Sequence, residues 1–482
     1  MNDAVRALEP TALWNHFADL NAVPRPSKKE ERVIRFIKEF GEGLGLPTEV
    51  DHAGNVIIRK PGTKGKEKAR TVALQSHLDM VHQKNSDTAF DFEKEGIRMK
   101  VEGDRVKAEG TTLGADNGIG VAAIMALLAS KDIPHPPLEA LFTIDEETGM
   151  TGAFELKGGL LKADILLNLD TEEDNELTIG CAGGVDVTAS GAYAEEAIPG
   201  GHVAQRISIS GLNGGHSGTD IHRGLGNANK IMGRILLEGE AHGLRVAAIE
   251  GGSLRNAIPR ESVATIALPK ESEEAFAGAF DRLKATIKRE YATTDPELRI
   301  ERKSAEAPAR IMSAADQGRF LRAVQACPNG IHRMSPDVEG LTQTSNNLAR
   351  IELEDGAYTV MCLTRSSVDS EKMDEANTIK AVFELIGAKV EYSGAYPGWT
   401  PRPDAAIVKL MADIYRKRFN EEPHVLACHA GLECGILGTN YPDMEMISFG
   451  PTIRGAHSPD EWVGIASVRK FWGYLLETLE RI

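Results

Sequence analysis

The feature that most constrains this chain is a series of five short segments that carry acids or histidines, most of them directly after an apolar run. Such runs are typical of strands buried on both faces, as in a parallel sheet. The carboxyl ends of parallel strands meet at one edge of the sheet, and active sites form there. The sequence therefore predicts that five segments come together in space: Ser76–Asp79, Gly114–Gly118, Asp145–Gly149, Leu169–Thr171 and Gly455–Ser458.

Strands and helices are predicted to alternate around these segments. Apolar runs at 71–75, 138–144 and 165–169 indicate strands, and the stretch 119–128 indicates a helix. A further strand at 444–449 leads toward the last segment. This alternation indicates an α/β domain with a mixed, mostly parallel sheet and flanking helices.

Between residues 184 and 397 the acid- and histidine-bearing segments disappear and a second pattern begins. Two series of similar element order follow one another, each with a strand, a helix, two strands and a helix. The first series runs over 203–291, and the second begins again at 297–303. We therefore predict an inserted α+β domain of two βαββα-like halves at 184–397. The α/β domain would then be discontinuous, formed by residues 1–183 and 398–482.

Composition excludes some classes of partner. The 482 residues are too many for one core, and the net charge of -16 comes without a basic stripe, so nucleic acid is not expected as a partner. The longest apolar run, 121–129, is too short to span a membrane. The five cysteines form no CxxC pair, and the first residues carry no signal-peptide pattern. These features predict reduced thiols in a cytoplasmic protein.

The five segments offer a mixed nitrogen and oxygen ligand set. Two histidines and three carboxylates suit a pair of divalent ions such as zinc, manganese or cobalt. His77 and Asp79 are two residues apart and would share one face at a strand end, so Asp79 could orient the His77 ring. Of the adjacent acids Glu146 and Glu147, one could bind metal while the other acts as a base.

Each segment alone also has an ordinary structural interpretation. The His-x-Asp pair could arise by chance, the Glu146-Glu147 pair could be a solvated acidic turn, and Asp116 could be a helix cap. Asp170 precedes an acidic stretch that could be a surface loop, and His457 could be a loop histidine. The joint appearance of all five, in this order and mostly at strand ends, favours the metal site.

The ordered set resembles the clan of two-zinc aminopeptidases, dipeptidases and deacylases that includes aminoacylases, carnosinases and bacterial tripeptidases, and in particular the bacterial aminoacyl-histidine dipeptidases. The likeness covers essentially the whole chain. It is carried by QSHLDMV, GTTLGADNGIG, FTIDEETGMTGA, LNLDTEE, GGHSGTDI, SLRNAIPR, LTRSS and FGPTIRGAHSPDE. The resemblance implies that the α/β domain is catalytic and that the inserted domain is a lid.

The resemblance also implies a role for each residue of the site. Asp79 would orient a ligand and Glu146 would be the general base. The metal ligands would be His77 and Asp170 for one zinc, Glu147 and His457 for the other, and Asp116 bridging both. An aspartate at position 170 is similar to the di- and tripeptidases of the clan, whereas its deacylases typically have glutamate there.

Three residues of the lid are expected to bind substrate. His216 and Asn256 would stabilise the oxyanion, and Arg365 would bind the free carboxylate of a dipeptide with its planar guanidinium. His216 could instead be an ordinary loop histidine, and Arg365 could form a surface ion pair. Ser217 is not expected to be a nucleophile, because its context lacks the final glycine of a nucleophile elbow.

The sequence thus predicts a two-metal dipeptidase that acts on small peptides with a free C-terminus. The resemblance alone implies that these include Xaa-His dipeptides such as β-alanyl-histidine. Two alternatives stay open: an N-acyl amino acid deacylase on the same fold, and a non-catalytic peptide-binding protein. We also expect that any homodimer forms through the lid, with His216 acting in its own chain.

Overall fold

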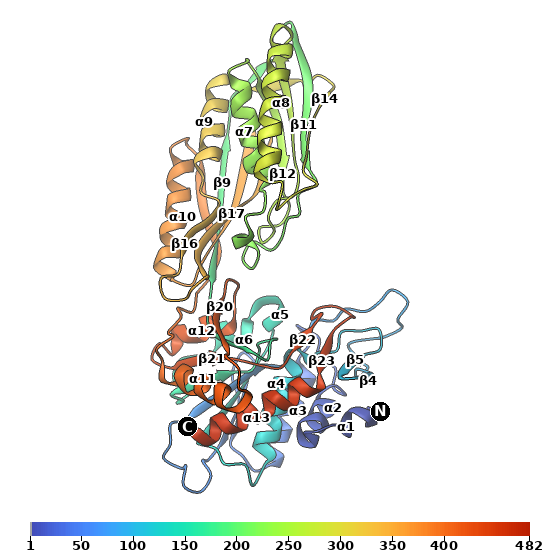
Figure 1. The fold of residues 1–482 in the computed structure, drawn as a ribbon, viewed down its shortest axis with the longest axis vertical. Coiled ribbons are helices and arrows are strands. Elements are labelled where there is room, and N and C mark those ends of the chain that lie inside the picture. Colours follow the sequence, from blue (N-terminus) through green and yellow to red (C-terminus); the bar gives the residue numbers. More distant parts are fainter. Residues whose placement is uncertain (1) are drawn as a thin grey trace. The chain divides into compact units, whose positions relative to one another are not determined.

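The computed structural model describes residues 2–482, which divide into two compact units (Figure 1). Unit 1 comprises Met1–Gly180, Trp399–Ala427 and Leu432–Ile482, and unit 2 comprises Cys181–Gly398 and Cys428–Gly431. These divisions fall within a few residues of the boundaries proposed from the sequence. The short segment Cys428–Gly431 is the exception, because it groups with the inserted unit.

The centre of unit 1 is an eight-stranded mixed sheet. Its four central strands are parallel, whereas β1, β2 and β8 pair antiparallel at the two sides. All six residues of β3 are buried, as the apolar run required. In spatial order the strands are β1 (Thr48–Val50), β2 (Val56–Lys60), β6 (Leu138–Thr143), β3 (Val72–His77), β7 (Ile165–Asn168), β21 (Glu445–Ser448), β8 (Glu176–Cys181) and β20 (His424–Cys428).

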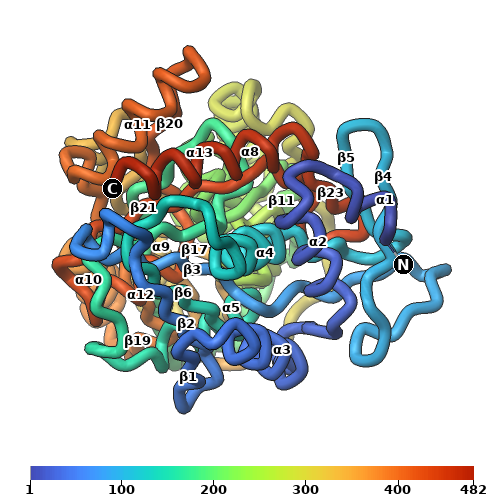
Figure 2. The backbone as a smooth tube through the Cα atoms, turned by 90° about the horizontal axis from the view of Figure 1, so that it is seen from below, coloured from blue at the N-terminus to red at the C-terminus, as the bar shows by residue number. Residues whose placement is uncertain are grey.

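Helices from both ends of the chain flank this sheet (Figure 2). The longest apolar helix, α4, follows Gly114, whose φ of 68° favours glycine, and it packs against β3. Helices α11 and α13 pack through Tyr415 and Tyr474. The helices of unit 1 are α1 (Asp3–Arg6), α2 (Thr11–Leu20), α3 (Glu31–Gly43), α4 (Ala115–Ala129), α5 (Glu146–Gly149), α6 (Thr151–Glu155), α11 (Ala406–Phe419), α12 (Glu433–Asn440) and α13 (Ile465–Arg481).

A smaller four-stranded sheet completes unit 1. Its strands all pair antiparallel, and it includes the short hairpin that precedes the last helix. In spatial order they are β22 (Ile453–Arg454), β23 (Trp462–Gly464), β5 (Arg105–Ala108) and β4 (Met99–Glu102).

Unit 2 is built on a nine-stranded antiparallel sheet with its helices packed on the sheet (Figure 1). The main path runs β14 (Arg299–Ser304), β11 (His202–Ser210), β13 (Ser262–Pro269), β12 (Arg245–Gly251), β17 (Thr342–Glu354), β18 (Ala357–Ser366), β9 (Gly183–Ala192) and β19 (Lys389–Tyr396), and β16 (Gly330–Met334) pairs with β17. The helices are α7 (Ala228–Glu240), α8 (Glu273–Glu290), α9 (Ala314–Ala326) and α10 (Asp369–Glu384). Strands β10 (Glu195–Ala197) and β15 (Arg310–Met312) form a separate pair.

The strand order of unit 2 shows two similar halves that meet between β12 and β17. The first half is β14-β11-β13-β12, and the second, read from the other edge, is β19-β9-β18-β17. One detail differs from the sequence-based prediction, which began the second half at 297–303. That strand, β14, pairs with β11 and is the edge strand of the first half. In the second half β19 takes the corresponding edge position, and its neighbour β9 corresponds to β11.

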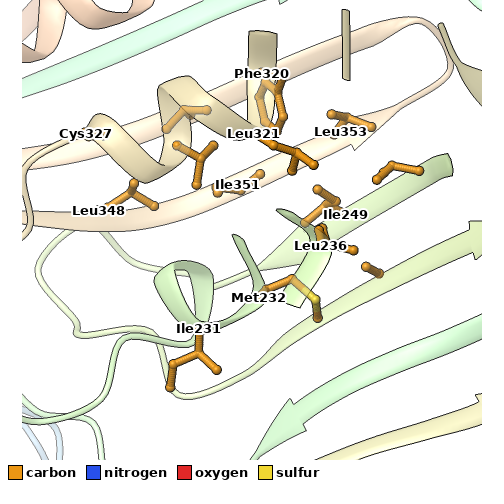
Figure 3. Close-up of a cluster of buried hydrophobic side chains, with 14 of the residues drawn as sticks. Ile231, Met232, Leu236, Ile249, Phe320, Leu321, Cys327, Leu348, Ile351 and Leu353 are labelled. Atoms are coloured by element: carbon orange, nitrogen blue, oxygen red, sulfur yellow. The ribbon is translucent and has the colours of Figure 1, made fainter. Parts of the chain in front are cut away.

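One hydrophobic core joins the halves of unit 2. Side chains of α7, α9, β12 and β17 meet in it (Figure 3). Phe320 and Ile351 come from the second half and Leu236 and Ile249 from the first, and all four are at most 4% exposed. Burying each such side chain is worth about 1.5–3 kcal/mol, so this shared core stabilises the complete sheet.

Two expectations from composition concern the chain as a whole. Over residues 2–482, no helix combines the length and the apolar character needed to cross a bilayer. The five cysteines form no disulfide, and four of them are buried.

Candidate functional site

The predicted ligands of unit 1 lie at or just after the carboxyl ends of its central strands. His77 is the last residue of β3, and Glu146 and Glu147 begin α5, directly after β6. Asp170 follows β7, and His457 lies in the turn between β22 and β23. Asp116 stands in the first turn of α4. The structure therefore brings together all five segments that the sequence singled out.

Asp116 lies between the two histidines. Its Oδ1 is 3.1 Å from His77 Nε2, and its Oδ2 is 3.3 Å from His457 Nε2. On the His77 side, Asp170 Oδ1 lies 3.5 Å from the same ring nitrogen. On the His457 side, Glu147 Oε2 lies 2.9 Å from the ring nitrogen. One carboxylate thus faces two separate histidine–carboxylate pairs, one with each oxygen.

These separations fit divalent ions. In a tetrahedral site with ligand distances of about 2.0–2.1 Å, neighbouring ligand atoms lie about 3.3 Å apart. The histidine–carboxylate distances of 2.9–3.5 Å match that spacing. Three groups in this region have ligand atoms within 4.8 Å of one another: His77/Asp116/Asp170, Asp116/Glu147/His457 and His77/Glu146/Glu147. The residue types and their spacing therefore suit two ions that share Asp116.

The carboxylates of the site raise the pKa of both imidazoles. Burial would lower the pKa of His77, but Asp170 and Asp116 outweigh it and hold that pKa well above its usual value. Hydrogen bonds to Asp116 and Glu147 raise the pKa of His457 to about 11. Burial would raise the pKa of the Asp116 carboxyl, but bonds from both histidines hold it well below the usual range. A site that retains two protons so strongly also attracts metal cations, which would displace them.

Asp79 contacts both the His77 ring and the backbone of the acidic pair Glu146-Glu147. Its side chain is fully buried. The Asp79 backbone carbonyl lies 3.2 Å from His77 Nδ1, and its Oδ1 lies 3.4 Å from the same ring nitrogen. The same carboxylate accepts the backbone N–H groups of Glu146, at 3.0 Å, and Glu147, at 3.3 Å, as well as the Ser27 hydroxyl at 2.8 Å. Asp79 therefore holds the tautomer of one ligand and the position of the acidic pair together.

Glu146 has the surroundings of a proton acceptor. Its backbone is fixed by Asp79, and burial raises the pKa of its carboxyl well above the usual value, with Asp170, Glu433 and Glu147 adding to the rise against the opposing effect of His77. Groups that take and return protons near neutral pH need such a shift.

Sequence reasoning missed a second buried glutamate under the centre. Glu433, the first residue of α12, accepts hydrogen bonds from Gln75 at 2.6 Å and Thr143 at 2.8 Å through Oε2. Its Oε1 is buried without a hydrogen-bond partner, and burial raises the pKa of the group to about 7. The GLECG stretch that carries it looks like an ordinary helix start, so no local pattern marked it.

The three predicted substrate-binding residues lie in unit 2, and two of them are in contact. Arg365 Nη2 lies 3.5 Å from His216 Nε2, and the guanidinium also bonds to the Tyr396 hydroxyl at 2.6 Å and Ser217 Oγ at 3.4 Å. The backbone carbonyl of Asn256 accepts the N–H of Ser217 at 2.8 Å, which places Asn256 beside the same turn. Arg365 is 5% exposed and forms no ion pair with a carboxylate within the described residues, so the surface ion-pair interpretation is wrong.

A further histidine of unit 2 belongs to this cluster. His429 is 8% exposed, its Nε2 pairs with Ser345 Oγ at 2.8 Å, and its Nδ1 has no hydrogen-bond partner. Burial, with Arg365, His216 and His222 nearby, lowers the pKa of His429 to about 3, so the ring is neutral. Its carbonyl also lies against Gly218, where a Cβ would come within 2.1 Å of the oxygen. The sequence gave no sign of this role, because His429 comes from a distant segment.

The chain is similar to known proteins over most of its length. The model of peptidase family M20/M25/M40 matches residues 73–481. The cytosol non-specific dipeptidase of Escherichia coli strain K12 is 43% identical over 476 residues, covering 98% of each chain. The crystal structure of aminoacylhistidine dipeptidase from Vibrio alginolyticus superposes with a TM-score of 0.96 at 45% identity, over 99% of this chain and 98% of that one.

A more distant structure shares the fold alone. An aminopeptidase from Bacillus cereus has a TM-score of 0.57 at 15% identity, with 98% of each chain covered. The family model spans most of the sequence, and the two similar dipeptidases span nearly all of it. The chain belongs to peptidase family M20/M25/M40.

Proposed function

We propose that this chain is a metal-dependent dipeptidase that hydrolyses dipeptides with a free C-terminus, including Xaa-His dipeptides such as β-alanyl-histidine. The observation that carries the proposal is the position of Asp116, which faces His77 with one carboxylate oxygen and His457 with the other. The names of the two relatives at 43% and 45% identity support the substrate class.

The proposed cofactor is a pair of divalent ions, zinc first and cobalt or manganese as alternatives. His77 and Asp170 would hold one, Glu147 and His457 would hold the other, and Asp116 would contact both. When bound, such ions supply Lewis-acid activation of the scissile carbonyl and of the attacking water. The family is metal-dependent, and the three ligand groups described above are consistent with two ions.

Glu146 is the proposed general base. Its carboxylate takes a proton from the attacking water and afterwards returns it to the leaving amine. Asp79 keeps the Glu146 backbone in place through the 3.0 Å hydrogen bond. A buried carboxylate with a raised pKa is suited to both steps, because its proton affinity lies nearer to that of the groups with which it exchanges.

The residues of unit 2 are proposed to select the substrate. The Arg365 guanidinium would bind the C-terminal carboxylate, and its bonds to Tyr396 and Ser217 already orient its plane. His216 and Asn256 would donate hydrogen bonds to the oxygen of the scissile carbonyl. Burial and Arg365 lower the pKa of His216, so the ring is neutral, and Nδ1 accepts the N–H of Thr219 at 3.1 Å. The ring proton is then on Nε2, which can donate to substrate, and the 3.5 Å separation from Arg365 Nη2 is a contact between two donors and not a hydrogen bond.

The test is a substrate panel assayed with metal-stripped protein and added zinc, cobalt or manganese. The panel contains dipeptides, among them β-alanyl-histidine, together with N-acetyl amino acids and tripeptides. We expect hydrolysis of the dipeptides only after metal is restored. Preferential cleavage of N-acetyl amino acids would identify a deacylase instead, and peptide binding without turnover would identify a binding protein.

Two accompanying proposals concern context. We infer a cytoplasmic location, which the name of the Escherichia coli relative supports. A homodimer formed through unit 2 stays a prediction, and sedimentation of the purified chain would test it.

A further inference from the structure

A buried glutamate lies four residues after the ligand His457. Glu461 is 2% exposed, and its carboxylate accepts backbone N–H groups from four consecutive residues of another segment. Oε2 accepts from Leu113 at 2.7 Å and Gly114 at 2.9 Å, and Oε1 accepts from Ala115 at 2.8 Å and Asp116 at 3.3 Å. The last of these residues is the proposed bridging ligand.

This carboxylate satisfies the loop that leads into α4. Leu113 and Gly114 precede that helix, and Asp116 and Asn117 have non-helical backbone angles, so these N–H groups lie before its regular part. Buried backbone N–H groups need a hydrogen-bond partner. Here the partner comes from a segment that is remote in sequence, and that segment carries a second ligand.

His457 and Glu461 lie in two consecutive turns that share Ser458. The N–H of Ser458 bonds to the Gly455 carbonyl at 3.2 Å, and the N–H of Glu461 bonds to the Ser458 carbonyl at 3.1 Å. A side chain fixed at Glu461 therefore fixes the turn from which His457 extends. The distance between Asp116 and His457 is thus set by protein contacts as well as by the ligands themselves.

Arg25 holds the same loop from its other side. The guanidinium is 1% exposed and donates to the Gly114 carbonyl at 2.6 Å. It also donates to the carbonyls of Leu78 and Asp79, both at 3.1 Å, directly after His77. The loop before Asp116 is therefore tied to the His77 strand by Arg25 and to the His457 turn by Glu461.

We propose that Glu461 is a positioning residue of the metal centre: it aligns Asp116 with His457 before any ion binds, and so raises the affinity for the ion that these two residues share with Glu147. The inference rests on the proposed function, because it assumes that divalent ions bind there. Partners that orient metal ligands typically contribute about 10–100-fold in metal affinity.

The test compares Glu461→Gln with a matched control, Glu139→Gln. Glu139 lies in the same unit, is 4% exposed, and accepts the backbone N–H groups of Lys162 at 2.7 Å and Ala163 at 3.0 Å. It stands near the opposite end of β6 from Glu146 and Glu147. Each variant replaces one carboxylate oxygen with an NH₂ group, which cannot accept a hydrogen bond. In Glu461 both oxygens accept N–H groups, whereas in Glu139 one oxygen accepts both N–H groups and the other faces Arg59 at 3.3 Å.

Zinc affinity is measured by competition with a chelator. We expect the affinity of Glu461→Gln for the weaker-binding zinc ion to fall by about 10–100-fold. Glu139→Gln should keep the wild-type zinc affinity, even if its melting temperature falls. At saturating zinc the KM of Glu461→Gln should equal that of the wild type. Equal zinc affinity in Glu461→Gln and wild type would overturn the inference alone, whereas absence of zinc binding by the wild type would overturn the proposed function.

A second measurement needs no variant. Amide hydrogen exchange of the metal-free wild type reports whether the N–H groups of residues 113–116 are already bonded. We expect them to be protected without metal, since Glu461 accepts all four. Rapid exchange that becomes slow only when zinc is added would show that the ion orders this loop, and the inference would be wrong.

Discussion

Asp79 accepts the backbone N–H of Glu146 at 3.0 Å through the same oxygen, Oδ1, that lies 3.4 Å from the His77 ring. The residue that orients a proposed ligand therefore also fixes the proposed base. A shift of Asp79 would move both groups, so ligand geometry and proton transfer are coupled through one carboxylate.

The role of the base can be tested with Glu146→Gln, which keeps the size of the side chain but cannot take a proton. We expect kcat to fall by about 10²–10⁴-fold, the usual contribution of a general base. Metal content, measured by elemental analysis, should stay at the wild-type level. Glu147→Gln serves as the comparison, because it should lose metal as well as activity. Metal loss from Glu146→Gln would instead place Glu146 among the ligands.

The shared position of Asp116 predicts a difference between two ligand variants. Asp116→Asn should weaken both ions, because each carboxylate oxygen faces a different histidine. His77→Ala should weaken mainly one. Zinc titration of the two metal-stripped variants, followed by calorimetry, separates these results. If both variants lose the two ions equally, Asp116 does not bridge them.

Substrate selection by Arg365 can be tested with Arg365→Ala. The variant should raise KM strongly for dipeptides and leave KM for dipeptide amides nearly unchanged, because amides have no carboxylate to bind. Arg255→Ala is a suitable control, since Arg255 lies in the same unit and pairs with Asp186 at 3.3 Å. Equal damage to dipeptides and amides would give Arg365 a different role.

The buried ring of His429 predicts a pH dependence of stability. Its pKa in the folded protein, about 3, is below the value of about 6.5 for an unfolded histidine. The unfolded state therefore binds the proton first, and stability is lost as pH falls from about 6.5 toward 3, by about 1.4 kcal/mol per pH unit. In urea unfolding between pH 4.5 and 6.5, the free energy of unfolding of His429→Gln should fall less steeply with decreasing pH than that of the wild type. If the free energies of the two proteins fall in parallel, the His429 ring is protonated in the folded protein.

The ligand-bearing strand ends were predictable because the signal is local. Around His77 and Asp170 a buried strand ends in a polar residue, and that transition can be seen in a few neighbouring letters. Glu461 and Arg25 were not predictable in this way. Their bonds join segments that are distant in sequence, and nothing in the local pattern specifies the partner.

In unit 2, too, local sequence predicts elements but not the contacts between distant segments. The strand predicted at 297–303 is present as β14, because its position depends on the local sequence. Pairing is a different matter, because a strand such as β14 has no local feature that selects β11 over another edge. The assignment of 297–303 to the second half followed chain order, whereas the sheet places β9 there.

The strand order of the unit 2 sheet also sets the order in which its strands can pair during synthesis. The strands of the first half lie in one continuous stretch from β11 to β14, and they can pair as soon as that stretch has emerged. Strand β9 is made earlier, but its neighbours β18 and β19 are made last. Closing such a long loop is slow, and an unpaired apolar strand is prone to aggregation while it waits. A nascent chain that ends after β14 therefore carries a folded half-sheet beside an orphan strand, and this is the stage at which we expect a chaperone to be needed most.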